Sequence, residues 1–323
     1  MPQPSRGGPA AQAGAPATTR VVLAFGAVYF VWGSTYLAIR WAIETMPPLL
    51  MASARFLVAG VFLYGWARAR GIPRPTASQW KAAAISGSLL LVGGNGAVVT
   101  AEQWVPSGLV ALLAATVPLW MVLLDVRFGA RVRPSRRAVV GLAVGFTGVV
   151  LLAGSPGVGA GGARELFGGF VVLCGSLSWA AGSIYSRYTT QMTRPELWVG
   201  MQMLAGGTVL GLLSLALGEP FDFDVGAVSL RSALSLVYLI VFGAVVAYGA
   251  YIWLLTVVEP AKVATYAYVN PVVAMALGWG LAGEPLTGRS VLAGAVIIGA
   301  VVMISGERRA VPTRGVVQRR MTE

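Results

Sequence analysis

The chain has 323 residues, of which 56% are hydrophobic and only 11% are charged, and its mean hydropathy is +0.74. Because a soluble domain carries about 25% charged residues, this composition excludes an ordinary soluble protein and predicts an all-α membrane protein. The net charge of +12 does not indicate nucleic-acid binding, since the basic residues lie in short linkers between apolar runs and in the C-terminal tail.

Several residue types on which enzymes depend are rare or missing. The chain has no histidine, which excludes Ser-His catalysis and histidine-ligated metal sites, and its one cysteine cannot make a cysteine-ligated metal site. It also lacks the GxxxxGK[ST] loop of P-loop ATPases. We therefore expect a protein that is not an enzyme, with no catalytic residues, no metal site and no cofactor.

The N-terminal segment 1–20 is rich in Pro, Ala and Gly and is predicted to be a disordered cytoplasmic tail. The apolar run that follows, 21–39, is longer than the roughly 7–15 residues of a signal-peptide core, and no small-residue cleavage site follows it. This run is therefore predicted to be an uncleaved first span.

Ten apolar runs are predicted to cross the membrane, since each approaches the roughly twenty residues that span a bilayer as a helix. Linkers that contain proline or glycine separate them, such as GIPRP at 71–75 and GEP at 218–220. The predicted spans are residues 21–43, 48–68, 78–100, 105–126, 137–154, 167–188, 196–217, 229–256, 260–282 and 288–305.

The basic residues are distributed unevenly between the two sides that these spans define. If the N-terminus faces the cytoplasm, nineteen of the twenty-four Lys and Arg residues lie on the cytoplasmic side, including those of the basic tail 307–323. Short cytoplasmic loops carry an excess of Lys and Arg in membrane proteins. Both termini are therefore predicted to be cytoplasmic.

The second half of the chain repeats features of the first. At an offset of 147 residues, Trp32, Arg40, Pro48 and Gly60 match Trp179, Arg187, Pro195 and Gly207. At an offset of 153, VPSGLVALLAATVP (105–118) matches VEPAKVATYAYVNP (258–271) at five of fourteen positions. The collinear order of these matches indicates two related units, 21–154 and 167–306, joined by an outer linker at 155–166.

Each unit contains five predicted spans, and five is an odd number. The second unit must therefore enter the membrane from the opposite side, which predicts two inverted five-helix repeats around a central cavity. Inverted repeats are typical of secondary transporters, in which substrate binds near the membrane midplane between the repeats.

Aromatic and amide side chains recur in the middle of the predicted spans. Trp32 and Tyr36 are four residues apart, so they share one helix face. An aromatic residue near a helix end usually anchors the membrane interface, whereas aromatic residues in mid-span beside Asn favour a wet internal cavity. The residues predicted to line this cavity are Trp32, Tyr36, Asn95, Trp179, Tyr248, Tyr251, Tyr266 and Asn270, with Arg55 flanking it.

Arg55 is the only charged residue deep within a predicted span, about 10 Å beyond the start of its helix at the α-helical rise per residue. An arginine inside the membrane is a functional-site hypothesis by default. One interpretation is a structural ion pair with Glu44 or Glu102, or a helix-end contact. The other is a contact with a substrate carboxylate.

Pro118 and Pro271 occupy equivalent places in their spans. A proline at such a place removes the hydrogen bond to the carbonyl four residues earlier and bends the helix. Two interpretations stay open: a static kink that shapes the bundle, and a paired hinge beside the cavity.

Several segments resemble the EamA family of the drug/metabolite transporter superfamily, and within it the YedA-like inner-membrane members. They are FVWGSTYLAIRWA, RFLVAG, VGGNGAVVTAEQWVPSG, ATVPLW, SWAAGSIYSR and ATYAYVNPVVA. The resemblance covers about residues 21–306. It implies ten helices, two EamA repeats, a central substrate cavity and a bacterial inner-membrane location. It also implies export or exchange of small metabolites, amino-acid-like compounds or drugs.

The sequence as a whole therefore predicts a secondary transporter that works by alternating access. Its expected partners are a small-molecule substrate and the lipid bilayer, without nucleic acid, and a homodimer is left open. Two alternatives remain: a membrane-embedded enzyme that acts on a lipid-linked substrate, and a non-transporting scaffold or sensor.

Overall fold

The computed structural model describes residues 18–128, 136–153, 162–189, 194–258, 263 and 266–305. Among these residues, all regular structure is helical. Residues 1–17 of the predicted N-terminal tail, 155–161 of the predicted linker and the basic tail 307–323 lie outside the described residues.

Three spans are continuous helices whose central turns widen into π-helix. They are α1–η1–α2 (Thr18–Gly26, Ala27–Val31, Trp32–Ala42), α4–η2–α5 (Ala77–Gly87, Ser88–Gly96, Ala97–Ala101) and α11–η5–α12 (Leu230–Tyr238, Leu239–Tyr248, Gly249–Val257). The other long helices are α3 (Pro48–Ala69), α8 (Arg136–Ala153), α9 (Ala163–Thr189), α10 (Pro195–Ala216), α14 (Tyr266–Ala282) and α15 (Gly288–Ser305). A short 3₁₀ turn, η4 (Val225–Ala227), precedes α11.

Six helices in the described part of the chain are long and apolar enough to cross a membrane. These are Thr18–Ala42, Pro48–Ala69, Ala77–Ala101, Ala163–Ser186, Pro195–Ala216 and Leu230–Val257, and three shorter apolar helices are Ser107–Met121, Val269–Ala282 and Gly288–Ala300. The all-α, multi-spanning membrane fold predicted from composition is therefore confirmed.

The predicted span 105–126 is not one regular helix. It divides into α6 (Ser107–Ala114) and α7 (Val117–Phe128), with a break at residues 115–116. Pro118 has no N–H to donate to the carbonyl of Ala114, so the regular bonding pattern stops there. The Thr116 hydroxyl donates instead to the carbonyl of Leu113, at 2.7 Å. Pro118 thus lies in the first turn of α7 rather than inside a continuous helix.

The most extensive helix contact among the described residues joins the two halves of the chain: α3 packs along α10. Glycines allow this approach, because a Cβ at Gly60 would lie 2.9 Å from the backbone nitrogen of Leu204, and one at Gly200 would lie 2.8 Å from that of Tyr64. Residues later in α3 contact residues earlier in α10, so the two helices are antiparallel. Both helices start at a proline and have 22 residues.

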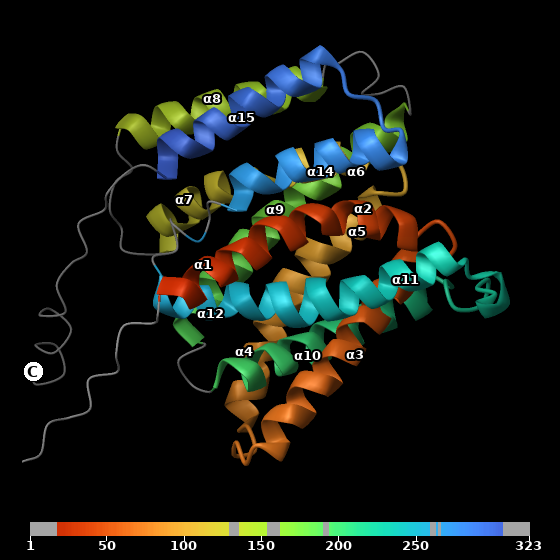
Figure 1. The fold of residues 1–323 in the computed structure, drawn as a ribbon. Helices are drawn as coiled ribbons and strands as arrows, with labels where there is room; N and C mark the ends of the chain where they lie inside the picture. Colours follow the sequence, from red (N-terminus) through yellow and green to blue (C-terminus); the bar gives the residue numbers. More distant parts are fainter. Residues whose placement is uncertain are drawn as a thin grey trace, which may run out of the picture.

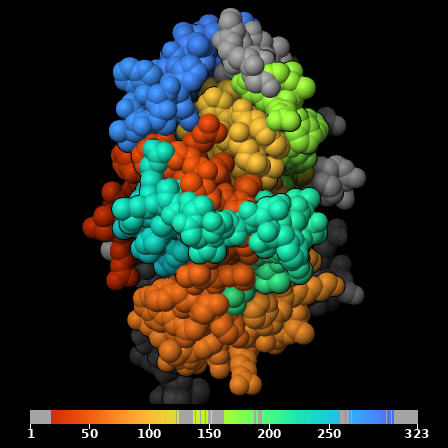
Figure 2. Space-filling view, turned by 90° about the vertical axis from the view of Figure 1, so that its right-hand side faces the viewer, coloured from red at the N-terminus to blue at the C-terminus, as the bar shows by residue number. Residues whose placement is uncertain are grey.

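Other close pairs also combine one early and one late helix: α8 with α15, α9 with η2, and α14 with α6. In Figure 1, α8 and α15 form a pair at one edge of the bundle. Figure 2 shows the end of the molecule at which α11 begins, where cyan segments of the second half lie between red and orange segments of the first. The two halves are therefore interleaved rather than placed side by side.

Two carboxylates of the second half bind the N-termini of helices in the first half. Glu219, just after α10, accepts the backbone N–H groups of Leu49 (3.2 Å) and Leu50 (2.8 Å) at the start of α3. Glu284, just after α14, accepts those of Ser107 (2.8 Å) and Gly108 (3.1 Å) at the start of α6. The first N–H groups of a helix have no partner within it and carry partial positive charge, so a carboxylate there is stabilising. We call these two contacts the glutamate clips.

Candidate functional site

A cavity lies between helices of both halves, at the centre of the bundle. Together with its opening it contains about 620 Å³ of empty space. Seven of the nine residues predicted to form the cavity line it: Trp32, Tyr36, Arg55, Asn95, Trp179, Tyr266 and Asn270. Small or apolar side chains complete the wall, among them Thr35, Val98 and Ser176.

The π-helical segments lie next to this cavity. Segment η1 ends directly before Trp32, and η2 contains Asn95. Segment η5 contains Gly243, whose carbonyl accepts a hydrogen bond from the Trp32 indole nitrogen at 3.3 Å. A π-helical turn disturbs the regular backbone bonding and occurs frequently at functional sites. Here it places polar groups of three spans around one space.

Trp32 is the centre of the aromatic wall. Its ring meets those of Trp179 and Tyr266 edge to face, with centroids 5.6 Å and 5.4 Å apart and interplanar angles of 82° and 86°. These spacings are in the favourable range for aromatic pairs. The three rings come from α2, α9 and α14, so the wall forms only when segments far apart in the sequence pack together.

Tyr248 and Tyr251 do not line the cavity, in contrast to the prediction. They form a layer behind it and are almost fully buried. Tyr251 lies 4.9 Å from Trp32 between ring centroids, and its hydroxyl bonds to the Ser183 hydroxyl at 2.9 Å. The Tyr248 hydroxyl donates to the side-chain oxygen of Gln202 at 3.0 Å. Neither Ser183 nor Gln202 lines the cavity, so we interpret these tyrosines as support for the aromatic wall.

Gln202 is a polar residue within α10 that the sequence interpretation missed. Its amide nitrogen donates to the hydroxyls of Ser86 (2.8 Å) and Ser186 (3.2 Å), and its oxygen accepts from Tyr248. Trp198 donates to the same Ser186 hydroxyl at 3.1 Å. A glutamine in the middle of an apolar run was the available signal, because such a group needs hydrogen-bond partners when buried.

Arg55 is buried and reaches the cavity from α3. Its guanidinium lies against Gly243, where a Cβ would be only 2.9 Å from Nη2, and it lies 4.9 Å from the Phe56 ring centroid. Nη1 is 3.5 Å from the side-chain oxygen of Asn95, at the limit of a hydrogen bond. The site therefore holds a positive charge at its wall.

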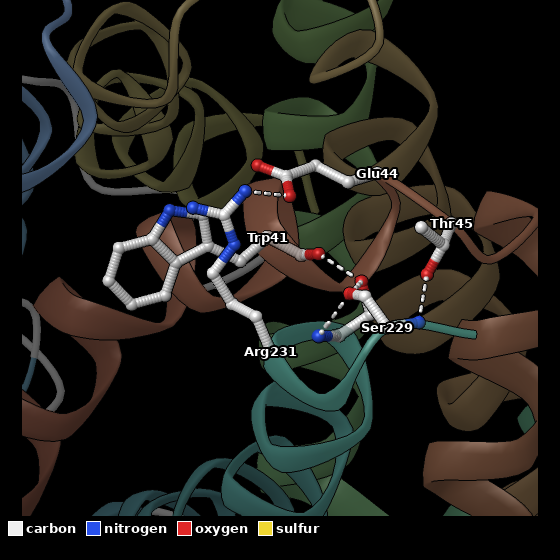
Figure 3. A network of polar contacts seen from close by, with 6 residues as sticks. Trp41, Glu44, Thr45, Ser229 and Arg231 are labelled. Carbon is white, nitrogen blue, oxygen red and sulfur yellow. Dashed lines mark hydrogen bonds and ion pairs between the residues drawn. The ribbon is translucent and has the colours of Figure 1, made fainter. Parts of the chain in front are cut away.

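The ion pairs proposed for Arg55 are not formed. Glu44 pairs instead with Arg231, at the junction where α2 ends and α11 begins (Figure 3). In the same junction, the Ser229 N–H donates to the Thr45 hydroxyl at 3.2 Å. Among the described residues, no carboxylate oxygen lies within 4.0 Å of Arg55. Arg55 thus makes no direct ion pair with Glu44 or Glu102 in this conformation.

Asn270 and Pro271 stand together inside α14. The Asn270 amide, with its nitrogen facing them, donates to the carbonyl oxygens of Tyr29 at 3.0 Å and Tyr266 at 3.3 Å. The contact to Tyr29 crosses from α14 to η1, beside the proline. Pro271 lies in the interior of α14 as predicted, whereas Pro118 is the second residue of α7 and follows a break. Whether these prolines act as hinges stays a prediction.

The described residues contain no group of three or more His, Cys, Asp or Glu side chains that could hold a metal ion. What converges at the cavity is a set of aromatic rings, two amides and one guanidinium. This set can bind a small molecule through ring contacts, hydrogen bonds and one charge.

Comparison with known proteins gives consistent matches. The sequence model of the EamA-like transporter family matches residues 19–154 and again 166–306. The uncharacterized inner membrane transporter YedA of Escherichia coli is 41% identical over 297 residues, covering 90% of this chain and 92% of YedA. A probable amino-acid metabolite efflux pump of Salmonella typhimurium is 30% identical over 297 residues, covering 86% of this chain and 92% of the pump.

A solved crystal structure also has a similar fold. It aligns with a TM-score of 0.65 at 20% sequence identity, and the alignment covers 94% of this chain and 99% of the other. At this level of identity the likeness concerns the fold alone.

Proposed function

Because the chain belongs to the EamA-like transporter family, we propose that it is a secondary transporter of the bacterial inner membrane that moves small metabolites by alternating access. The observation that carries this proposal is the central cavity, lined by aromatic rings and one arginine from both halves of the chain. A cavity between related halves is the place where such transporters bind substrate.

Two inverted five-helix repeats, ten spans in all, account for several features together. The family model matches the chain twice. Helices α3 and α10 start 147 residues apart, have equal length and are antiparallel, which supports an inverted relation between the units 21–154 and 167–306. Exchange of conformation between two such units would open the cavity first to one side of the membrane and then to the other.

The orientation with both termini in the cytoplasm rests on the distribution of charge. Helix α1 begins and α15 ends on the same side of the bundle in Figure 1, which supports a common location for both termini. The Lys and Arg excess supports a cytoplasmic location for that side.

The cavity favours a substrate with a carboxylate and an apolar or aromatic body, such as an amino-acid-like compound. Arg55 would bind the carboxylate, since guanidinium and carboxylate groups match in geometry and charge. Trp32, Trp179 and Tyr266 would contact the apolar body. The Salmonella relative named as a probable amino-acid metabolite efflux pump supports this substrate class.

The test compares intracellular and extracellular metabolites in bacteria with and without overexpression of the chain. We expect amino-acid-like compounds to move from one pool to the other, and Arg55→Ala and Asn270→Ala to abolish the change. Arg231→Ala is the matched control, because Arg231 is an exposed arginine outside the cavity. Equal membrane levels of all variants are verified by immunoblotting.

Unchanged metabolite pools with a fully inserted protein would contradict the transporter proposal. That result would favour the alternatives, an enzyme acting on a lipid-linked substrate or a non-transporting scaffold or sensor. A shift that survives both cavity substitutions would leave transport in place and contradict the assignment of the site.

A further inference from the structure

Glu102 is a carboxylate that neither the cavity wall nor the glutamate clips use. It directly follows α5, one helical turn after Val98, which lines the cavity. Its backbone is fixed at both ends: the N–H donates to the Val98 carbonyl at 3.0 Å, and its carbonyl accepts from the Arg40 guanidinium. Its side chain is completely buried, and neither carboxylate oxygen has a hydrogen-bond partner.

An ionised carboxylate in such surroundings is strongly disfavoured. Transfer of a charge from water to a buried site costs far more than transfer of a neutral acid, and the group takes up a proton instead. Burial raises the pKa of the Glu102 carboxyl well above its usual range, and Glu284 raises that pKa further, while Arg40 and Arg55 lower it. Burial without a hydrogen-bond partner therefore favours the neutral form of the Glu102 side chain in this conformation.

The charged and titratable groups around Glu102 come from every neighbouring segment. Those that interact with it are Tyr36 and Arg40 of α2, Arg55 of α3 and Glu284 after α14. Glu165 lies in the first turn of α9, a helix that packs along α5. Two of them, Tyr36 and Arg55, line the central cavity. Two others, Glu165 and Glu284, line a second pocket of about 580 Å³.

Glu102 thus interacts electrostatically with the walls of both hollows. Ser107, at the start of α6, is a second buried polar group whose hydroxyl has no hydrogen-bond partner, and its backbone N–H donates to Glu284, which lines the second pocket. The Glu102 carboxyl and the Ser107 hydroxyl thus lack hydrogen-bond partners close to two cavities. We infer that a change of conformation can bring water from one of these cavities to the Glu102 carboxyl.

We propose that Glu102 is the proton-binding site through which transport is coupled to pH. This inference rests on the proposed function and deepens it. While the carboxyl is buried as in this structure, one proton forms an O–H bond with a Glu102 carboxylate oxygen. When the bundle opens and water reaches the carboxyl, that bond breaks, the proton passes to water and the carboxylate keeps the electron pair.

The charge of Glu102 also changes the affinity of the cavity for a carboxylate. While Glu102 is neutral, the positive charge of Arg55 is left for the substrate, and once Glu102 is ionised it competes with the substrate for that charge. Binding of the proton and of a carboxylate-bearing substrate therefore favour each other, and by linkage each raises the affinity for the other.

The direct test is infrared difference spectroscopy of the purified full chain in liposomes, titrated with pH and without added substrate. The wild type is expected to show the C=O band of a protonated carboxyl at about pH 7, where ordinary glutamates are ionised. Glu102→Gln should lose this band. Glu44→Gln is the matched control, since Glu44 is an exposed, paired glutamate, and it should retain the band.

Glu102→Asp keeps an acid at the site and should retain a titrating band at an altered frequency, which separates loss of the group from loss of the fold. A wild type without a protonated carboxyl at neutral pH, or an undiminished band in Glu102→Gln, would overturn the proposal. This measurement needs no substrate, so its outcome is independent of the metabolite test. Unchanged metabolite pools together with the Glu102 band would contradict transport but not proton binding. Changed metabolite pools without the band would contradict only the role of Glu102.

Discussion

Two Gly-x-Pro turns that lie 147 residues apart, Gly71-Ile72-Pro73 and Gly218-Glu219-Pro220, have the same backbone and different roles. Each glycine ends a helix with a positive φ, 78° in the first turn and 83° in the second. In each turn the glycine N–H bonds three residues back and the next N–H bonds five residues back, which is the Schellman arrangement. The repeated sequence pattern thus specifies one backbone turn twice.

The side chain between glycine and proline makes the difference. Ile72 packs against the apolar core, and its carbonyl accepts from Arg68 within the same turn. Glu219 reaches across to the start of α3 and also accepts from the Ser214 hydroxyl at 2.7 Å. One turn closes its own helix, whereas the other also ties the second half of the chain to the first.

The largest expected effect comes from making the second turn like the first. Glu219→Ile removes the acceptor for Leu49, Leu50 and Ser214, which leaves two helix-end N–H groups and a buried hydroxyl without their partner. We expect a loss of about 3 kcal/mol in stability, measured as a lower thermal unfolding midpoint in detergent. Ile72→Leu, a volume-conserving change in the equivalent turn, is the control and should cost less than about 1.5 kcal/mol. Equal losses in the two variants would contradict the difference between the turns.

Glu102 contrasts with the clips, because it lies buried without a partner. Its pKa is raised in the folded state, so the folded chain retains a proton that the unfolded chain releases, and stability falls as pH rises above the ordinary glutamate range. Glu102→Gln removes this dependence. The stability of the variant relative to wild type should therefore increase with pH, by at most about 1.4 kcal/mol per pH unit, and level off below about pH 4. Unfolding midpoints over a pH series measure this, and a difference that does not vary with pH would contradict it.

Glu284→Gln tests whether the second clip depends on charge. The glutamine keeps one oxygen that can accept from Ser107 or Gly108, and it loses the attraction between the carboxylate and the positive end of α6. We expect a loss of about 1 kcal/mol. Gln79→Glu, a charge change at an exposed helix start, serves as the comparison. If Glu284→Gln changes the free energy of unfolding by no more than Gln79→Glu does, the clip does not depend on charge.

The smallest effect should be equal in the two turns. Gly71→Ala and Gly218→Ala each place a Cβ in the left-handed region, which costs about 1 kcal/mol. Neither glycine has a neighbouring atom within 4 Å of the added Cβ, so backbone conformation alone sets the cost. The two unfolding midpoints should fall by the same amount, and a clear difference would show that the turns are not conformationally equivalent.

Much of the fold could be predicted because hydropathy and punctuation are local properties. The predicted span 48–68 corresponds to α3, and 196–217 to α10, each within one residue at either end. The division of the predicted span 105–126 into α6 and α7 could not be located from hydropathy, because apolar composition continues through the break before Pro118.

The candidate site could be predicted in part. Aromatic and amide residues in mid-span have to find polar surroundings, so their convergence on one cavity was a reasonable expectation. The sequence could not show that Tyr248 turns toward Gln202 and Tyr251 toward Ser183, since those partners lie on other helices. Their separation in the sequence is too large for any periodicity to reveal the contact.

The sequence by itself determined the membrane class, the main spans, the repeated offsets and the turn glycines, because each follows from composition or from residues close together in the chain. Only the tertiary structure decided the state of the carboxylates. Glu219 and Glu284 accept hydrogen bonds from helix N-termini, and Glu44 pairs with Arg231. The Glu102 carboxylate is buried without a hydrogen-bond partner. The reason is physical: whether a buried charge is satisfied depends on distances of a few ångströms between segments that are far apart along the chain.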